Sequence, residues 1–85
     1  MENYEIEIKK SAQKELEKLP KKDIQIIVEK INGLCKNPRG PNSIKLSGDE
    51  KYRMRVGRYR VLYEIVDQVL MIYVIKIAHR KEVYR

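Results

Sequence analysis

Apolar positions alternate with polar ones in some stretches of this chain and recur at helical spacing in others. Residues 4–9 (YEIEIK) alternate, which is typical of a strand with one buried face. Ser11 is expected to cap a short helix that Pro20 ends, and a second helix stops before Asn37-Pro38. The apolar positions at helical spacing are Ala12, Leu16 and Leu19 in the first helix and Ile24, Ile27, Val28, Ile31, Leu34 and Cys35 in the second.

The second half of the chain predicts strands. Residues 38–50 hold two prolines and two glycines, so we expect mostly loop with a short extended piece at 43–46. Two-residue turns at Gly57-Arg58 and Asp67-Gln68 then separate three strands, which cover residues 51–56, 59–66 and 69–78. The order β-α-α-β-β-β predicts an α+β fold, with a small antiparallel β-sheet and two N-terminal helices packed on one face of it.

The two turns also predict the register of the sheet. Arg55 should oppose Arg60, Arg53 should oppose Leu62, and Leu62 should oppose Tyr73 on the next strand. Directly opposed residues share a face of the sheet. One face, expected to lie under the helices, carries Met54, Val56, Tyr59, Val61, Tyr63, Ile65, Leu70, Ile72 and Val74. The other face carries Arg53, Arg55, Arg60, Leu62, Glu64, Met71, Tyr73, Ile75 and Ile77, and His79 joins it if the alternation continues.

Length and charge narrow the class of protein. The chain has 85 residues, with 19 lysines and arginines against 12 aspartates and glutamates, a formal net charge of +7. This length predicts one domain over residues 1–85. No apolar run approaches the roughly 18–20 residues that span a bilayer, and residues 1–10 lack the order of a signal peptide. One cysteine and one histidine exclude a disulfide framework and a structural zinc site. We expect a cytoplasmic protein whose charge favours nucleic acid, an anionic membrane or an acidic protein as partner.

The predicted Arg55–Arg60 pair points to an anion site. Like charges placed opposite each other destabilise a hairpin, and an anion bound between them removes that cost. The planar guanidinium suits phosphate because it can bind two oxygens at once. Two other interpretations stay open: both arginines extend into water, or Glu64 neutralises one of them.

Other residues extend the predicted binding surface. Tyr73 lies among the arginines of the second face and could stack on a base, although a half-buried packing role is common for such a tyrosine. The chain ends with a basic segment that contains His79, Arg80, Lys81 and Tyr84. Histidine titrates near neutrality, so it can transfer protons.

Two segments resemble a known family. The run 52–65 (YRMRVGRYRVLYEI) and the tail 79–84 (HRKEVY) resemble the RelE/ParE superfamily of toxins from bacterial and archaeal toxin–antitoxin pairs. Residues 12–16 (AQKEL) and the loop 37–48, which begins with NPR and ends with KLSG, fit the same family. The resemblance covers nearly the whole chain, and the strand pair and the tail are its specific parts.

The resemblance to the RelE branch implies a microbial RNase-like fold and ribosome-dependent cleavage of mRNA in the ribosomal A site. It implies inhibition by a small, acidic antitoxin encoded next to the toxin, with which the chain would form a heterotetramer. It implies no cofactor, no metal and no membrane partner.

Several residues match the catalytic positions of the family. Arg60 matches the arginine of the middle strand, Arg80 the arginine near the end of the last strand, and Tyr84 the C-terminal tyrosine. Arg53 and Arg55 match a basic pair that is two lysines in the best-known RelE toxin. Arginine does not lose its proton in proteins, so this pair can hold phosphate but is poorly suited to proton transfer.

The implied reaction is attack of a ribose 2′-OH on its own 3′-phosphate without a metal. Charge on the phosphate would be stabilised by arginines, and His79 or Tyr84 would act as general base or acid. The candidate catalytic residues are Arg55, Arg60, His79, Arg80 and Tyr84. The candidate RNA- and phosphate-binding residues are Arg53, Arg58, Tyr73 and Lys81.

Two alternatives use the same features differently. A toxin of the ParE branch poisons DNA gyrase with the same fold, but such a protein does not need to assemble a phosphate-cleaving site. A plain RNA-binding module would tolerate Arg-to-Lys changes and would not require His79 or Tyr84.

Overall fold

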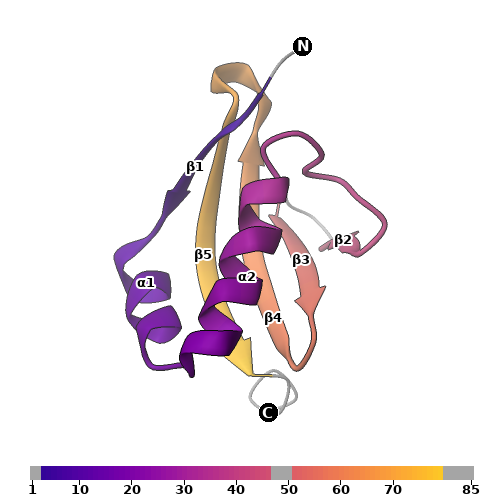
Figure 1. Cartoon of the computed structure of the whole chain (residues 1–85). Helices are drawn as coiled ribbons and strands as arrows, with labels where there is room; N and C mark the ends of the chain where they lie inside the picture. The colour runs from indigo at the N-terminus through magenta and orange to yellow at the C-terminus, as the bar shows by residue number, and fades with distance from the viewer. Residues whose placement is uncertain (1–2, 47–50, 80–85) are drawn as a thin grey trace.

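Five strands form one mixed sheet, and both helices pack on the same face of it (Figure 1). The computed structural model describes residues 3–46 and 51–79. The elements in chain order are β1 (Glu5–Ile8), α1 (Lys10–Glu17), α2 (Lys21–Gly33), β2 (Ser43–Lys45), β3 (Lys51–Val56), β4 (Tyr59–Val66), the 3-10 turn η1 (Asp67–Val69) and β5 (Met71–His79). No helix in the described ranges is long and apolar enough to cross a membrane.

The strand order is β1-β5-β4-β3-β2, and β1 runs parallel to β5. The prediction of a wholly antiparallel sheet is therefore wrong at this pair. No hairpin connects these two strands, and the chain crosses both helices and the rest of the sheet before β5 pairs with β1. The prediction of an extended piece at 43–46 is confirmed, because β2 pairs with β3 at the other edge.

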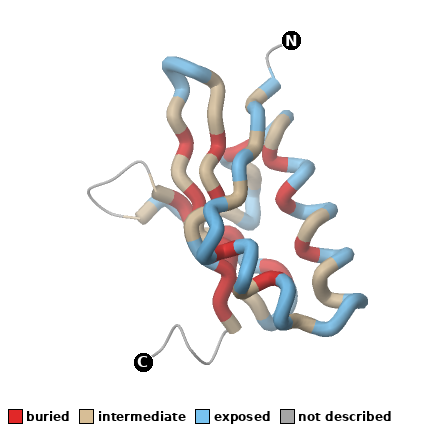
Figure 2. The backbone as a smooth tube through the Cα atoms, turned by 90° about the vertical axis from the view of Figure 1, so that its left-hand side faces the viewer, coloured by how far each residue is buried: buried red, intermediate tan, exposed pale blue. Residues whose placement is uncertain are grey.

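The core lies between the helices and the sheet. Buried positions alternate along β4 from Val61 onward and recur about once per turn on α2 (Figure 2), as the sequence pattern predicts. Ser11 is not a cap, however. Helix α1 begins at Lys10, and its N-cap Lys9 makes no side-chain hydrogen bond. The buried apolar residues include Ala12, Leu16, Ile27, Ile31, Leu34, Tyr52, Met54, Val56, Val61, Tyr63, Ile65, Ile72, Val74 and Ile77.

Helix α1 covers the part of the β5 edge that β1 leaves open. Strand β1 pairs with β5 only as far as Val74. Beyond that point the Glu15 side chain accepts a hydrogen bond from the backbone N–H of Ile77 at 2.9 Å and one from Lys76 Nζ at 2.7 Å. An unpaired edge invites pairing with other chains, so this side chain replaces a strand where the sheet would otherwise be open.

The connection between β4 and β5 is longer than predicted. The chain reverses through η1 (Asp67–Val69) and then Leu70, which has a left-handed backbone with φ of 53°. Val66 therefore pairs with Met71 rather than with Val69. From this turn to Tyr63 the pairing moves by two residues, so each residue of this part of β4 keeps its predicted face but meets a different partner.

A β-bulge then changes the faces of the last strand. The register shifts between Leu62 and Tyr63, since Tyr63 pairs with Val74 whereas Leu62 pairs with Lys76. One extra residue on a strand exchanges the two faces beyond it, because side chains alternate with period two. Ile77, predicted on the arginine face, is consequently in the core, where it is 4% exposed.

The hairpin between β3 and β4 depends on a glycine. Gly57 has φ of +57°, a conformation that costs an L-residue roughly 1–2 kcal/mol. We expect Gly57→Ala to lower the free energy of unfolding by about 1 kcal/mol, measured by urea denaturation. Gly33→Ala is the matched control. A Cβ added at either glycine meets nothing within 4 Å, and Gly33 has no positive φ. Equal effects of the two substitutions would contradict a conformational cause.

Candidate functional site

The β3–β4 hairpin brings two arginines side by side. Arg55 pairs with Arg60, and Arg53 pairs with Leu62, which confirms the predicted register. These residues lie on the sheet face opposite the core. Arg58 is exposed in the turn itself. Three of the five predicted phosphate-binding or catalytic arginines therefore share one face, and Arg58 lies at the turn that joins their strands.

Arg60 differs from the other arginines in its burial. It is 7% exposed and is the one charged residue among residues 3–46 and 51–79 that is buried. Its neighbours across the sheet are Arg55 on β3 and Ala78 on β5. Because Ala78 has only a methyl side chain, Arg55 is the larger of these two neighbours. Arg55 is exposed, so the pair places one guanidinium at the surface and one beneath it.

Tyr73 lies on the arginine face, but farther from the pair than predicted. It pairs with Glu64 on β4, not with Leu62. Glu64 is four residues from Arg60, which corresponds to about 13 Å along a strand. The Nζ atom of Lys9 lies 4.8 Å from the centroid of the Tyr73 ring. Lys9 and the Tyr73 ring therefore form a second positively charged position on the same face, separate from the arginine pair.

His79 lies on the other face of the sheet. It pairs with Tyr59, and the two rings meet edge to face with centroids 5.4 Å apart. The prediction that His79 shares a face with the arginines is wrong, because the bulge at Leu62 and Tyr63 exchanges the faces of β5 beyond it. Its proton-transfer role stays a prediction. Three further site residues, Arg80, Lys81 and Tyr84, lie outside the described residues.

A pocket opens beside His79 on the helix face. Its volume is about 280 Å³. Tyr59 lines it and donates a hydrogen bond from its hydroxyl to Asp23 Oδ2 at 2.6 Å, which raises the pKa of the tyrosine. The sequence did not point to this pocket, because α2 and the β3–β4 turn are far apart along the chain. The lining residues are Asp23, Ile26, Ile27, Val56, Gly57, Arg58, Tyr59 and His79.

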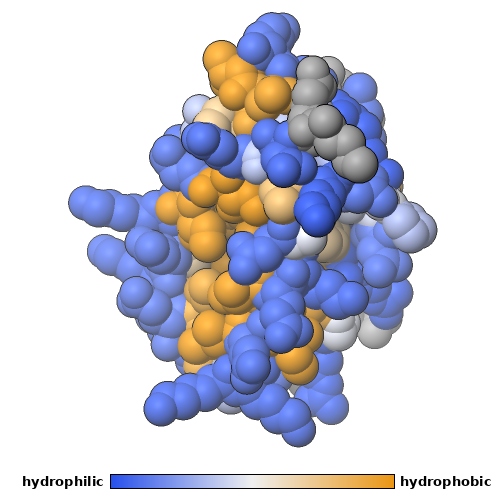
Figure 3. Space-filling view, turned by 45° about the horizontal axis from the view of Figure 1, so that its top comes forward, coloured by the Kyte–Doolittle hydropathy of each residue, from blue (hydrophilic) through white to orange (hydrophobic). Residues whose placement is uncertain are grey.

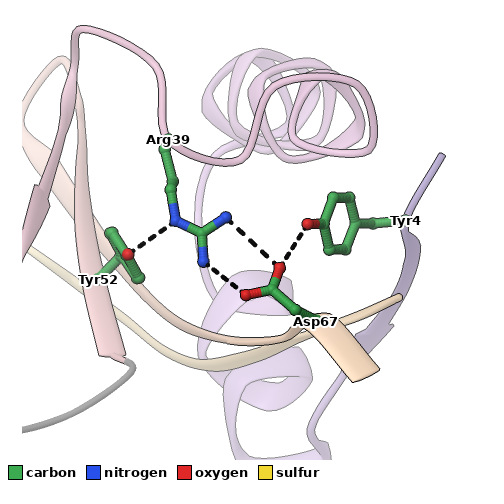
Figure 4. Close-up of polar contacts among 4 residues, drawn as sticks. All are labelled: Tyr4, Arg39, Tyr52 and Asp67. Atoms are coloured by element: carbon green, nitrogen blue, oxygen red, sulfur yellow. Dashed lines mark hydrogen bonds and ion pairs between the residues drawn. The ribbon is translucent and has the colours of Figure 1, made fainter. Parts of the chain in front are cut away.

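A second polar cluster fastens the loop after α2 to the sheet (Figure 4). Arg39 donates to both oxygens of Asp67, at 2.9 and 3.5 Å, and its Nε donates to the Tyr52 hydroxyl at 2.8 Å. The Tyr4 hydroxyl donates to Asp67 at 2.5 Å. Asp67 was expected only as a turn residue. The cluster lies at the β4–β5 turn, at the opposite end of the sheet from the arginine pair.

Asp67 makes stability depend on pH. The hydrogen bond from Tyr4 and the contacts with Arg39 hold the pKa of Asp67 below its usual 3.8. A carboxylate whose pKa falls on folding stabilises the fold above its unfolded-state pKa, and this contribution is lost as the pH falls through the folded-state pKa. We expect Asp67→Asn to be less stable than the wild type near pH 7, and the difference to shrink below about pH 4.

Urea unfolding from pH 7 to pH 3 measures this difference. Glu29→Gln, which removes an exposed carboxylate on α2, is the control and should track the wild type across the range. A deficit of Asp67→Asn that stays constant at every pH would contradict the role given to the ionised carboxylate.

Comparisons with known proteins identify the family to which the chain is similar. The model of the family described as "ParE toxin of type II toxin-antitoxin system, parDE" matches residues 6–84. A curated "Putative RelE-like toxin protein" of Escherichia coli is 32% identical over 81 residues, which cover 92% of this chain and 84% of that protein. A "Putative toxin RelE1" of Methanocaldococcus jannaschii is 33% identical over 86 residues, 96% of both chains.

Solved structures show the same fold. The chain matches the RelBE2 toxin–antitoxin complex of Mycobacterium tuberculosis with a TM-score of 0.79 and 25% identity, over 92% of this chain and 99% of that one. It matches the RelE–RelB complex of Pyrococcus horikoshii with a TM-score of 0.79 and 29% identity, over 92% and 96%. The expected architecture of two helices on a small sheet is therefore confirmed.

Proposed function

This chain belongs to the ParE toxin family of type II toxin–antitoxin systems, within the RelE/ParE superfamily, and we propose that it is a ribosome-dependent endoribonuclease. The proposal rests on the buried arginine that lies beside an exposed one, Arg60 beside Arg55. It is the toxin of a toxin–antitoxin pair of RelE type. The proposed substrate is mRNA in the ribosomal A site, and cleavage there stops translation. Such a substrate places the activity in the cytoplasm.

The observation that carries the proposal is the pairing of Arg55 with Arg60. Two positive charges on directly opposed residues destabilise a hairpin, and an anion bound between them removes that cost. In RNA cleavage the phosphate gains negative charge in the transition state. Fixed positive groups at that position act where they contribute most to the rate.

The proposed reaction needs no metal, because the nucleophile belongs to the substrate. The 2′-oxygen attacks the adjacent phosphorus, and the bond from phosphorus to the 5′-oxygen of the next nucleotide breaks. A general base takes the proton of the 2′-hydroxyl, and a general acid gives a proton to the leaving 5′-oxygen. The products are a 2′,3′-cyclic phosphate and a 5′-hydroxyl end. Arg55, Arg60 and Arg80 stabilise the charge, and Arg53 with Arg58 and Lys81 holds the flanking backbone.

Proton transfer is assigned to His79 and Tyr84. His79 lies at the end of β5 on the helix side of the sheet. A phosphate bound at the arginine pair lies on the other side, so the RNA would have to pass around the end of the sheet to contact both. Tyr84 is the other candidate, five residues farther along the chain. Separate pH–rate profiles of His79→Ala and Tyr84→Phe assign the base and the acid. If neither substitution slows single-turnover cleavage, neither residue transfers the proton.

The proposed protein partner is a small acidic antitoxin. RelE toxins of Mycobacterium tuberculosis, Pyrococcus horikoshii and Escherichia coli are solved in complexes with RelB antitoxins. This chain has a net charge of +7, which favours an acidic partner. In Figure 3 apolar residues form a band flanked by hydrophilic side chains, the kind of surface that an amphipathic segment can cover.

The matched family model favours one other function, inhibition of DNA gyrase, because that model describes ParE toxins. The two functions differ in what they require of the arginine face. Cleavage of RNA requires several positive groups around one phosphate, as Arg55 and Arg60 provide. A gyrase inhibitor has no such requirement.

One experiment separates the candidates. Purified protein is mixed with ribosomes that hold a defined mRNA and an empty A site, with naked mRNA in parallel, and the RNA ends are mapped by primer extension. We expect a cut within the A-site codon only on the ribosome. A gyrase supercoiling assay on the same preparation should show no inhibition. No cut together with inhibited supercoiling would overturn the nuclease proposal.

A further inference from the structure

The pocket beside His79 lies at the same end of the sheet as the arginine pair, but on the opposite face. Arg60 and its neighbour Tyr59 occupy successive positions on β4, so their side chains project to opposite faces. The pocket and the arginine pair are therefore two sites that meet at the end of the sheet formed by the β3–β4 turn.

One wall of the pocket is apolar. Ile27 and Val56 are buried, and Ile26 lies at the rim with 44% of its surface exposed. A volume of about 280 Å³ is at the small end of the range for ligand sites. It suits one ring system rather than a larger molecule.

The other side chains that line the pocket are aromatic or polar. The rings of Tyr59 and His79 stand at 85° to each other, so a flat ligand can lie parallel to only one of them. Asp23 holds the Tyr59 hydroxyl in place with one oxygen, Oδ2. A carboxylate has more than one acceptor position. Arg58 adds an exposed guanidinium at the turn.

We propose that this pocket binds a single nucleobase of RNA. A base has two flat faces, which fit the aliphatic wall and an aromatic ring, and it has an edge whose amino or ring N–H groups can donate to Asp23. Its phosphate would lie toward Arg58, at the end of the sheet. That the bound base belongs to the mRNA held by the arginine face rests on the proposed function. That the pocket binds a base does not depend on the proposed function.

An aliphatic side chain of a protein partner fits this pocket less well. It would cover the Asp23 carboxylate without donating a hydrogen bond to it, and such uncompensated burial of a charged group is costly. A nucleobase can stack on the apolar and aromatic side chains and also donate hydrogen bonds to Asp23, so it fits both kinds of lining residue.

A ¹H–¹⁵N NMR titration tests the proposal on the purified protein without ribosomes. The probes are the four ribonucleoside 5′-monophosphates, with ribose 5-phosphate as the matched probe that lacks a base. We expect saturable shifts at the amides of Ile27, Gly57 and Tyr59 with at least one nucleotide, at millimolar concentrations. Ribose 5-phosphate should leave the amide of Ile27 unmoved, because its phosphate reaches only Arg58 and that residue's neighbours.

Two isoleucine variants locate the binding site. Ile26→Ala removes the exposed side of the aliphatic wall and should raise the dissociation constant about fivefold. Ile44→Ala removes an isoleucine that is 57% exposed on β2, away from the pocket, and should leave binding unchanged. Both positions are exposed, so neither substitution threatens the core.

Four results would overturn the proposal. Ribose 5-phosphate could move the same amides, Ile27 included, or the nucleotides could shift the amides of Arg53, Leu62 and Tyr73 instead. The Ile26→Ala and Ile44→Ala variants could also bind the nucleotide with equal dissociation constants. The nucleotides could also leave the pocket unmoved up to about 10 mM while an acidic antitoxin shifts it, which would make it a protein-docking site. Cleavage on the ribosome is measured separately, so failure of base binding leaves the nuclease proposal standing, and the reverse also holds.

Discussion

Replacing Arg60 with alanine is expected to reduce ribosome-dependent cleavage at least about 100-fold. Removal of one fixed group that stabilises transition-state charge has effects of this size in other enzymes. Arg60 is buried beside Arg55, so solvent screens its charge less than that of an exposed arginine. The measurement is the single-turnover rate of A-site cleavage with saturating toxin.

Arg60→Lys tests the geometry of the group. Lysine keeps the charge but cannot bind two oxygens in the fork that a guanidinium offers. We expect a rate between those of the wild type and Arg60→Ala. A lysine variant as fast as the wild type would show that charge alone is required, as in a plain RNA-binding module.

Folding has to be separated from catalysis, because Arg60 is buried. Arg55→Ala serves this purpose, since Arg55 is exposed and its removal also relieves a like-charge pair. We expect it to slow cleavage at least about tenfold while thermal unfolding stays within a few degrees of the wild type. Lys14→Ala, an exposed lysine on α1, is the matched control. Full activity in Arg60→Ala and Arg55→Ala would remove the arginine pair from the mechanism.

The second large effect concerns stability. Ile27→Ala is expected to lower the free energy of unfolding by about 3 kcal/mol, because Ile27 is 0% exposed and belongs to the core cluster between α2 and the sheet. A domain of this size is stabilised by only about 4–13 kcal/mol. The substitution should therefore lower the midpoint of thermal unfolding by roughly 12–24 °C.

Ile26→Ala is the matched control for this prediction. Ile26 is the preceding residue of the same helix, but 44% of its surface is exposed. Its replacement should change the free energy of unfolding by less than about 0.5 kcal/mol, since alanine also favours helix. Urea and thermal unfolding of both variants measure the difference. Similar losses in the two variants would contradict the assignment of α2's buried face.

The β3–β4 hairpin shows why part of the site could be predicted. A two-residue turn with glycine first determines the register of the strands it joins. The pairing of Arg55 with Arg60 and of Arg53 with Leu62 therefore followed from four adjacent residues, and the structure confirms it. Turn chemistry of this kind acts locally, so it can be read without knowledge of the rest of the fold.

The β4–β5 hairpin shows where that reasoning stops. Leu70 adopts a left-handed backbone that is unusual for leucine. The bulge places one extra residue on β5, between the partners of Leu62 and Tyr63, and no local sequence signal indicates it. Both features lie where β5 meets a distant segment: the Leu70 carbonyl accepts a hydrogen bond from the Glu5 N–H at 2.8 Å, and Glu15 of α1 binds Lys76 and Ile77 beside the bulge. They moved Tyr73 away from the arginine pair and placed His79 on the helix face.

Contacts between distant segments were beyond prediction for a related reason. Arg39 and Asp67 are 28 residues apart, and Tyr4 and Asp67 are 63 apart. Tyr59 and Asp23 are separated by 36. Nothing in the local sequence of either partner indicates such a pair, because the partners approach only after the elements that carry them have packed.

The sequence by itself determined the elements, the covered face of the sheet and the arginine pair on its open face. Periodicity and turn chemistry act within a few residues, so they are independent of the final packing. Only the tertiary structure decided the parallel pairing of β1 with β5, the face of His79 and the pocket that Asp23 shares with the β3–β4 turn. Each of these depends on which segments meet in space, and a strand's own pattern shows that it has a buried face without showing which neighbour it will pair with.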